Sequence, residues 1–197
     1  MCTIDRDILP EQVILTGKYV KLRPIKVEDA EITLKWRSSQ RASLLNKGSN
    51  TVQEQRDWIT KQSKSNINMI IEYKDEPVGM LALVDINNDY KLAEYGRLLI
   101  GEIDKVGTAP VFFESSLLIL DYAFSKLNLH KIYGYMSVTN KQILNLWLNM
   151  GFVREGTMRD HIVLDGKFVD CAFISLLENE FYETLQPKMQ KLVDLYR

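Results

Sequence analysis

The order of strand-like and helix-like segments predicts a mixed α/β (α+β) fold, in which a central sheet carries helices on both faces. Short alternating segments separated by turn residues come first, which is typical of an antiparallel meander. A long apolar helix between two strand-like segments follows, which is typical of a βαβ crossover. With 197 residues, 46% of them hydrophobic, the chain is long enough to bury a core and fits a single domain.

The first half of the chain predicts four strands and two helices. The first helix covers 27–38, with Ile32 and Trp36 on one face. The second begins at a capping box, Thr51-Val52-Gln53-Glu54, because a threonine followed three residues later by glutamate satisfies two free N–H groups at a helix start. Turn residues at 74–77 and 87–89 separate the later strands. The expected strands are 18–23, 69–73, 78–84 and 92–100.

The second half predicts a crossover, a hairpin and a terminal helix. After a loop at 101–109, a helix runs from Pro110 to about residue 127, since proline suits a first helical turn. A strand at 131–138 leads to a helix at 141–150 that ends at a glycine. Asp165-Gly166 is a strong hairpin dipeptide between strands 152–164 and 168–176. The helix predicted at 179–197 contains Pro187, which favours a break or kink.

Composition narrows the class of protein. We expect one domain over 1–197, with a core of about 16–180 and a terminal helix at 181–197. A formal net charge of −1 gives no support to a nucleic-acid partner. Cys2 and Cys171 are too few for a disulfide framework and lack metal-ligand spacing. Acidic residues precede any apolar run at the N-terminus, and no apolar run approaches a membrane span. These features predict a cytoplasmic protein with no membrane partner.

The loop at 101–109 is the most informative stretch. A glycine-bearing loop that feeds a helix N-terminus exposes backbone N–H groups at the positive end of the helix dipole, where a phosphate binds well. The same composition also fits a plain connector. The interpretation of this loop as a phosphate site therefore depends on motifs elsewhere in the chain.

Several further motifs resemble one family in their order and spacing. They are 17–24 (Gly-Lys-Tyr-Val-Lys-Leu-Arg-Pro), 93–96 (Ala-Glu-Tyr-Gly), 121–124, 127–132, 140–156 with its Gly-Phe-Val-Arg-Glu-Gly ending, 159–161 and 165–170. From about residue 16 to 180 the chain resembles the GCN5-related N-acetyltransferase (GNAT) superfamily, in its ribosomal-protein and amino-sugar branches. The resemblance implies a mostly antiparallel mixed sheet whose fourth and fifth strands splay apart, and acetyl-CoA as co-substrate.

The resemblance also implies a coenzyme site. The pantetheine arm would lie along the fourth strand in the gap between the splayed strands, and the pyrophosphate would lie over the glycine loop. Gly107-Thr108-Ala109 matches the end of the family's loop, whereas Asp104 stands where the family has Gln or Arg. The implied coenzyme-binding residues are Leu98, Leu99, Ile100, Lys105, Val106, Gly107, Thr108, Ala109, Asn140 and Trp147.

The catalytic assignment is led by Glu94, on the fourth strand. We expect Glu94 to act as the base, directly or through water, with His161 as the next candidate; a solvated strand carboxylate is the alternative. Strand alternation predicts that Glu94 lies on the same face as Gly96 and opposite Arg97. Trp147 stands where the family has its thiolate-protonating tyrosine, and indole cannot serve as that acid. No metal is expected.

The acceptor substrate is the part of the expected reaction that the sequence specifies least. Trp36, Arg37 and Arg41 resemble the start of the amino-sugar acetyltransferases, and guanidinium groups suit a nucleotide diphosphate. Arg159 and Asp170, with His161, form a polar trio that would grip the acceptor or orient the hairpin. A nucleotide-linked amino sugar is therefore the expected small-molecule acceptor, with a polyamine or a ribosomal-protein N-terminus as the alternative. A non-catalytic acyl-CoA-binding module stays open, and so does a homodimer.

Overall fold

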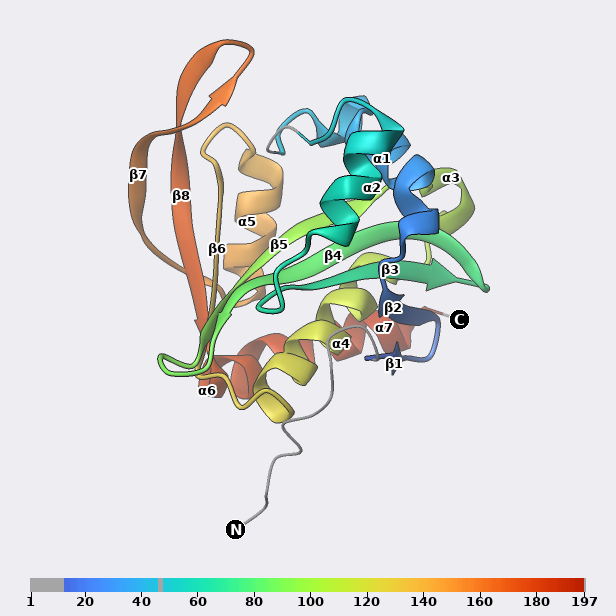
Figure 1. Cartoon of the computed structure of the whole chain (residues 1–197). Helices are drawn as coiled ribbons and strands as arrows, with labels where there is room; N and C mark the ends of the chain where they lie inside the picture. The colour runs from blue at the N-terminus through green and yellow to red at the C-terminus, as the bar shows by residue number, and fades with distance from the viewer. Residues whose placement is uncertain (1–12, 46–47, 197) are drawn as a thin grey trace.

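The computed structural model describes residues 13–45 and 48–196 and shows one eight-stranded sheet with helices on both faces (Figure 1). Cys2 and the ends of the predicted domain lie outside the described residues. The strands follow the order β1-β2-β3-β4-β5-β6-β8-β7 across the sheet. They are β1 (Leu15–Thr16), β2 (Val20–Pro24), β3 (Ile67–Tyr73), β4 (Glu76–Asn87), β5 (Leu92–Ile100), β6 (Lys131–Ser137), β7 (Val153–Leu164) and β8 (Lys167–Leu177).

The longer helices match the predicted segments closely, whereas the short helix α3 lies within the predicted loop at 101–109. The capping threonine is confirmed, since Thr51 Oγ1 accepts the Glu54 N–H at 3.1 Å, although the Glu54 carboxylate takes the N–H of Asn50. The helices are α1 (Ala30–Arg37), α2 (Val52–Thr60), α3 (Ile103–Val106), α4 (Val111–Ser125), α5 (Lys141–Met150), α6 (Glu178–Glu180) and α7 (Gln186–Leu195), with short 3₁₀ turns at Val27–Asp29 and Gln40–Ala42.

Strands β1 to β5 form the predicted antiparallel meander, and β5 is the point at which the sheet divides. β5 pairs in parallel with β6 over only three residue pairs, from Leu92↔Lys131 to Glu94↔Tyr133. Beyond Glu94 the two strands separate. The predicted α/β class and the splayed fourth and fifth long strands are therefore confirmed, counting from β2. The β7–β8 hairpin completes the sheet beyond β6 and projects past its neighbours (Figure 1).

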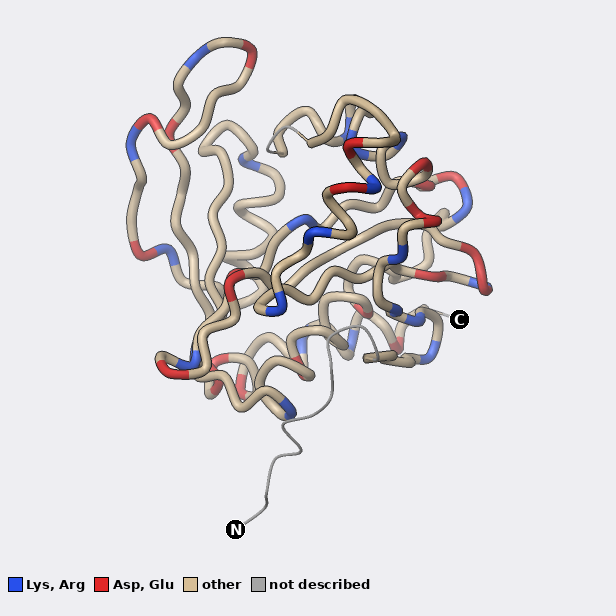
Figure 2. The backbone as a smooth tube through the Cα atoms, viewed as in Figure 1, with Lys and Arg blue, Asp and Glu red and all other residues tan. Residues whose placement is uncertain are grey.

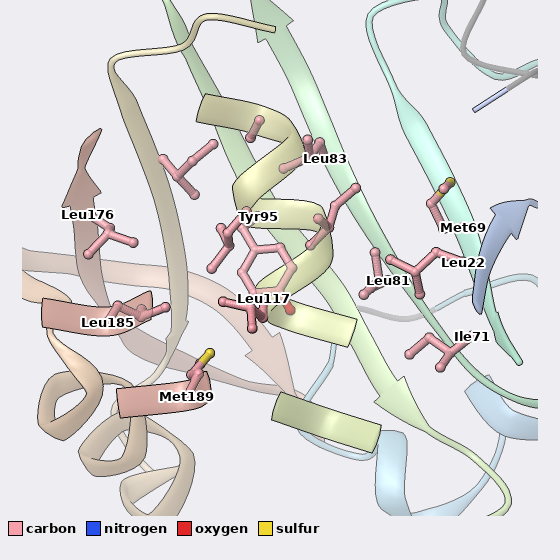
Figure 3. Packing of buried hydrophobic residues seen from close by; sticks show 14 of the residues in the cluster. Leu22, Met69, Ile71, Leu81, Leu83, Tyr95, Leu117, Leu176, Leu185 and Met189 are labelled. Atoms are coloured by element: carbon pink, nitrogen blue, oxygen red, sulfur yellow. The ribbon is translucent and has the colours of Figure 1, made fainter. Parts of the chain in front are cut away.

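The main core lies between the sheet and helices α4, α5 and α7. Figure 3 shows strand residues such as Leu22, Met69 and Leu81 in the same cluster as Leu117 of α4 and Met189 of α7. A second, smaller cluster lies on the opposite face, under α1. It contains Trp36, Ala42, Ile70, Met80 and Leu99. Both faces of the central strands are thus buried, which explains their nearly continuous apolar sequence.

The C-terminal segment continues as a helix through Pro187 instead of breaking there. A π-helical stretch, Phe181–Leu185, joins α6 to α7, and Pro187 lies in the first turn of α7. Proline cannot donate a backbone hydrogen bond, and the wider π-turn just before it accommodates that loss. The predicted irregularity is present, but as a change of helix type upstream of the proline.

Charged side chains of both signs are interspersed along the chain, as Figure 2 shows. This distribution agrees with the near-zero net charge. Within the described residues, no helix is long and apolar enough to cross a membrane.

Candidate functional site

A cleft of about 820 Å³ opens where β5 and β6 separate. One wall is formed by the helical segment from α1 to α2, and the other by the splayed strands and α5. The cleft therefore lies between the α1–α2 segment on one side and the splayed strands with α5 on the other. Its described lining includes Arg37, Arg41, Trp58, Asp85, Glu94, Tyr95, Gly96, Arg97, Leu98, Leu99, Ile100, Tyr135, Asn140, Trp147 and Cys171.

A β-bulge in β5 decides which side chains face this cleft. The β4–β5 register shifts between Met80↔Leu99 and Ala82↔Gly96, and Arg97 takes a left-handed backbone conformation with φ of 58°. An extra residue in one strand interrupts the alternation of side chains. Both Glu94 and Arg97 therefore line the cleft, and the prediction that they lie on opposite faces is wrong.

Glu94 is a half-buried carboxylate inside the cleft. Burial raises its pKa above the ordinary value, the negative charge of Asp85 raises it further, and Arg97 opposes both effects. Because Gly96 has no side chain, the carboxylate can lie against the strand there: a Cβ at this position would lie 3.1 Å from Glu94 Oε1. A carboxyl group with a raised pKa in a cleft is suited to accepting a proton near neutral pH.

Three guanidinium groups line the same cleft. Arg97 donates from Nη1 to Asn68 Oδ1 at 2.5 Å and lies over the ring of Trp58, with its Cζ 5.0 Å from the centroid. Burial lowers the pKa of Arg37, and the nearby charge of Arg97 lowers it further. Arg41 is more exposed and donates from Nε to the carbonyl of Ile100 at 3.1 Å.

Trp36 lies behind the cleft wall instead of lining it. Its side chain is 1% exposed, and its Nε1 donates to Glu102 Oε1 at 2.9 Å. The indole packs so closely on Gly101 that a Cβ there would approach the ring to 2.2 Å. Trp36 therefore fastens α1, and with it Arg37, to the end of β5. Its predicted contact with a substrate would have to be indirect.

The predicted pantetheine-binding residues lie along the opened edge of β5. Leu98, Leu99 and Ile100 all line the cleft where β6 no longer pairs with β5. A strand whose neighbour has moved away offers free backbone groups to an extended ligand. This arrangement is the one that the resemblance predicts for the coenzyme arm.

The predicted pyrophosphate loop forms a tight turn between α3 and α4. Gly107 has φ of 56°, a conformation that favours glycine, and nothing lies near its missing Cβ. Among residues 13–45 and 48–196, no acceptor is present for the backbone N–H groups of Thr108, Phe112 and Phe113. These N–H groups lie at the start of the 15-residue helix α4, where the dipole favours an anion. The loop therefore fits a pyrophosphate group.

The other residues of this loop have different surroundings. Val106 and Ala109 are buried in the main core, and their backbone N–H groups donate to the carbonyls of Glu102 and Val106. The N–H of Gly107 likewise donates to Ile103, so within the described part of the chain only Thr108, of the predicted donors at 106–109, keeps an N–H for a ligand. Lys105 is exposed and pairs with Glu76 of β4, which raises the pKa of the lysine. Its predicted role as a charge partner for the pyrophosphate stays a prediction.

Asn140 and Trp147 occupy the α5 side of the cleft. Asn140 stands at the N-cap position of α5, but its side chain makes no capping hydrogen bond and lines the cleft. Trp147 is 4% exposed and packs edge-on against Tyr95 and Phe152, with centroids 5.6 and 5.1 Å away. An aromatic wall at this position is compatible with packing against a coenzyme arm.

The predicted polar trio lies on the β7–β8 hairpin, next to the cleft but outside its lining. The register of β7 shifts between Met158 and Ile162, so strand alternation does not extend from Arg159 to His161. Asp170 accepts the backbone N–H of Asp160 at 2.9 Å, which stabilises this bulge. His161 is exposed and packs edge-on against Tyr135, with centroids 4.8 Å apart. Asp170 thus orients the hairpin, the second of its two predicted roles.

Sequence reasoning missed several cleft residues. Asp85 and Arg97 both adopt positive φ, and no local pattern marks them because neither is glycine. Tyr135 of β6 also lines the cleft. Cys171 lies there too, from β8. Among the described residues, no group of His, Cys, Asp and Glu side chains is arranged to hold a metal ion.

Comparison with known proteins assigns this chain to a family. The model of the GNAT acetyltransferase domain matches residues 20–153, more than half of the chain. The chain belongs to this family of acetyl-CoA-dependent acetyltransferase domains, as the sequence motifs predicted.

The individual relatives and solved structures compared below share 30% sequence identity or less with this chain. A spermidine N(1)-acetyltransferase of Vibrio cholerae is 30% identical over 104 residues, which cover 53% of this chain and 58% of that protein. A GCN5-related N-acetyltransferase from Brucella melitensis superposes with a TM-score of 0.78 at 24% identity, covering 93% of this chain and 86% of the other. The V. cholerae spermidine acetyltransferase in complex with CoA and spermine superposes with a TM-score of 0.73 at 22% identity, covering 85% and 100%.

Proposed function

We propose that this protein is an acetyl-CoA-dependent N-acetyltransferase that acts on the primary amine of a small molecule by direct acyl transfer. The observation that carries the proposal is the cleft at the β5–β6 splay, which places Glu94 beside the exposed edge of β5. The free N–H groups at the start of α4 support coenzyme binding at the other end of β5.

In this proposal, each part of the cleft has a distinct role. Leu98 to Ile100 hold the pantetheine arm, and a backbone N–H of this strand polarises the thioester carbonyl. Glu94 removes a proton from the incoming ammonium, directly or through water, because only a neutral amine attacks. Trp147 packs against the coenzyme. The coenzyme thiolate takes its proton from solvent, since a thiol with a pKa near 8.5 is mostly protonated at neutral pH and does not require a protein acid.

The acceptor has two candidate classes. A polyamine is favoured by the named V. cholerae relative and by the two carboxylates, Asp85 and Glu94, in the cleft. An amino sugar linked to a nucleotide is favoured by Arg37 and Arg41, because guanidinium groups pair well with diphosphate. Among the described residues, the cleft lining contains three arginines and two acidic residues, whereas polyamine recognition favours an excess of acidic groups. The arginines therefore favour the anionic acceptor.

The test is a thiol-release assay with acetyl-CoA over a panel of amines. The panel contains spermidine, a nucleotide-linked amino sugar and a peptide with a free N-terminus, and mass spectrometry identifies the acetylated product. We expect thiol release that depends on the amine. Tight acetyl-CoA binding by calorimetry without turnover on any amine would instead favour a non-catalytic acyl-CoA-binding module.

A further inference from the structure

Arg97 has no role in the proposed acyl-transfer step, yet its side chain lines the cleft beside Glu94 on the same strand. Its guanidinium is half-buried, is positioned by Asn68 and Trp58, and lies close enough to Arg37 to lower the pKa of that residue. Arg37 lines the same cleft, and a partly desolvated guanidinium group favours an anionic ligand that compensates its lost hydration.

The neighbouring carboxylates do not neutralise Arg97 by direct contact. Glu94 and Asp85 influence Arg97 electrostatically, but among residues 13–45 and 48–196 no ion pair within 4.0 Å joins Arg97 to either. Ser43, Ser49 and Gln40, which also line the cleft beside Arg37, add neutral hydrogen-bonding groups suited to an oxyanion. The cleft therefore contains groups suited to binding an anion next to the carboxylate of Glu94.

Glu94 and Arg97 are three residues apart on β5, so their Cα atoms are at most about 10 Å apart. Both side chains line the same cleft. One small ligand can therefore place an ammonium group at Glu94 and an anion at Arg97.

We propose that Arg97 and Arg37 form an anion subsite that selects acceptors bearing a phosphate or carboxylate group in addition to the reacting amine. This inference rests on the proposed function, because it assigns the amine to Glu94. It excludes spermidine, whose charges are all positive, as the preferred acceptor. It also adds Arg97 to the residues that determine specificity.

The first experiment measures binding without turnover. The protein is saturated with CoA, so that the coenzyme site cannot bind added phosphate, and is then titrated with glucosamine 6-phosphate or inorganic phosphate. Trp58 lies against Arg97, so its fluorescence reports occupancy of the subsite. We expect saturable binding by calorimetry and a fluorescence change that Trp58→Phe removes. The affinity should fall at least tenfold in Arg97→Gln and be unchanged in Arg56→Gln, an exposed arginine of α2 outside the cleft lining.

The second experiment compares acceptors that differ only in the anion. Glucosamine 6-phosphate is compared with glucosamine, and glycylglycine with its C-terminal amide, so that phosphate and carboxylate are tested separately. We expect kcat/KM for one anionic member to exceed that of its neutral partner at least tenfold. In Arg97→Gln this ratio should approach one through KM for the acceptor, with KM for acetyl-CoA unchanged, and Arg97→Lys should restore part of it.

The outcomes separate the two proposals. Absence of anion binding to the CoA-saturated protein, binding that Arg97→Gln leaves intact, equal use of charged and neutral partners, or preference for spermidine would each overturn the anion subsite. Binding that depends on Arg97 without acetyl transfer to any amine would sustain the subsite and contradict the proposed enzyme activity.

Discussion

Glu94 is partly buried, lies near the carboxylate of Asp85 and lines the cleft. These features make it the centre of the proposed chemistry. Its raised pKa has a direct consequence for the pH profile. A base must be deprotonated to act, so the acidic limb of kcat/KM should lie at higher pH than for an ordinary carboxyl group. Replacing Asp85 by Asn removes one cause of the upward shift, and the limb should move to lower pH.

The first prediction is that Glu94→Gln lowers kcat by a factor on the order of 10² to 10⁴, because the amide cannot accept the proton. The loss should shrink as pH rises and the amine deprotonates unaided. Steady-state kinetics between pH 6 and pH 10, with acetyl-CoA binding measured by calorimetry as a control, tests this. Near-normal turnover at neutral pH would remove Glu94 from the mechanism and direct attention to His161.

Trp147 carries the second prediction at this scale. Because it packs among Tyr95, Phe112 and Phe152 and has no acidic proton, Trp147→Phe should leave kcat within roughly tenfold, or about 1.4 kcal/mol. Affinity for acetyl-CoA should change modestly. Rapid-quench measurement of the acyl-transfer step is the check. A far larger loss of kcat at unchanged coenzyme affinity would mean that the indole takes part in the chemistry.

Between elements, Glu114 fastens the N-terminal strands to α4. Its buried carboxylate accepts backbone N–H groups of Lys18, Tyr19 and Val20 at 2.6 to 2.8 Å. Gly17 makes this approach possible, since a Cβ there would lie 2.7 Å from the carboxylate. Glu114 is therefore a structural residue, because its carboxylate bonds to the N-terminal strand region and does not line the cleft.

The third prediction follows from these contacts. Glu114→Ala leaves three backbone donors without their acceptor and should lower the free energy of unfolding by about 3 kcal/mol. Urea denaturation followed by circular dichroism measures the change. Glu183→Ala, at an exposed position of the π-helical segment, should change stability by less than about 0.5 kcal/mol. Equal effects of the two substitutions would contradict the assignment.

For the whole molecule, the C-terminal helix is part of the core and not an appendage to it. Phe181, Leu185, Met189 and Val193 recur every four residues, and all four are buried. The first three belong to the main core cluster with α4 and the sheet. The single-domain prediction for 1–197 is consistent with this arrangement, and cooperative unfolding would test it.

The fourth prediction is that a chain ending at residue 180 does not fold. Each buried side chain contributes roughly 1.5–3 kcal/mol, and their sum is comparable with the whole stability of a domain. In the full-length chain, Leu185→Ala should cost about 2–5 kcal/mol, whereas Leu195→Ala, which is 68% exposed, should cost little. Thermal unfolding of the full-length protein should show one transition. Two separate transitions, or a folded truncated chain, would contradict a single unit.

The sequence by itself determined the fold class, most element positions and the family, because these depend on local periodicity, turn residues and motif spacing. β5 was predicted at 92–100 and is observed there, and the hairpin follows from Asp165-Gly166. The loop before α4 was found in the same way, since its glycine and the helix after it are adjacent in the chain.

Only the tertiary structure decided which side chains meet in the cleft. The bulge that turns Arg97 toward Glu94 depends on how β5 pairs with β4, and the burial of Trp36 depends on its packing against Gly101, 65 positions away in the chain. The pKa of Glu94 likewise depends on Asp85 from another strand. Such contacts join residues distant in sequence, and a single extra residue in a strand reverses which face the following side chains occupy. Local patterns therefore could not specify them.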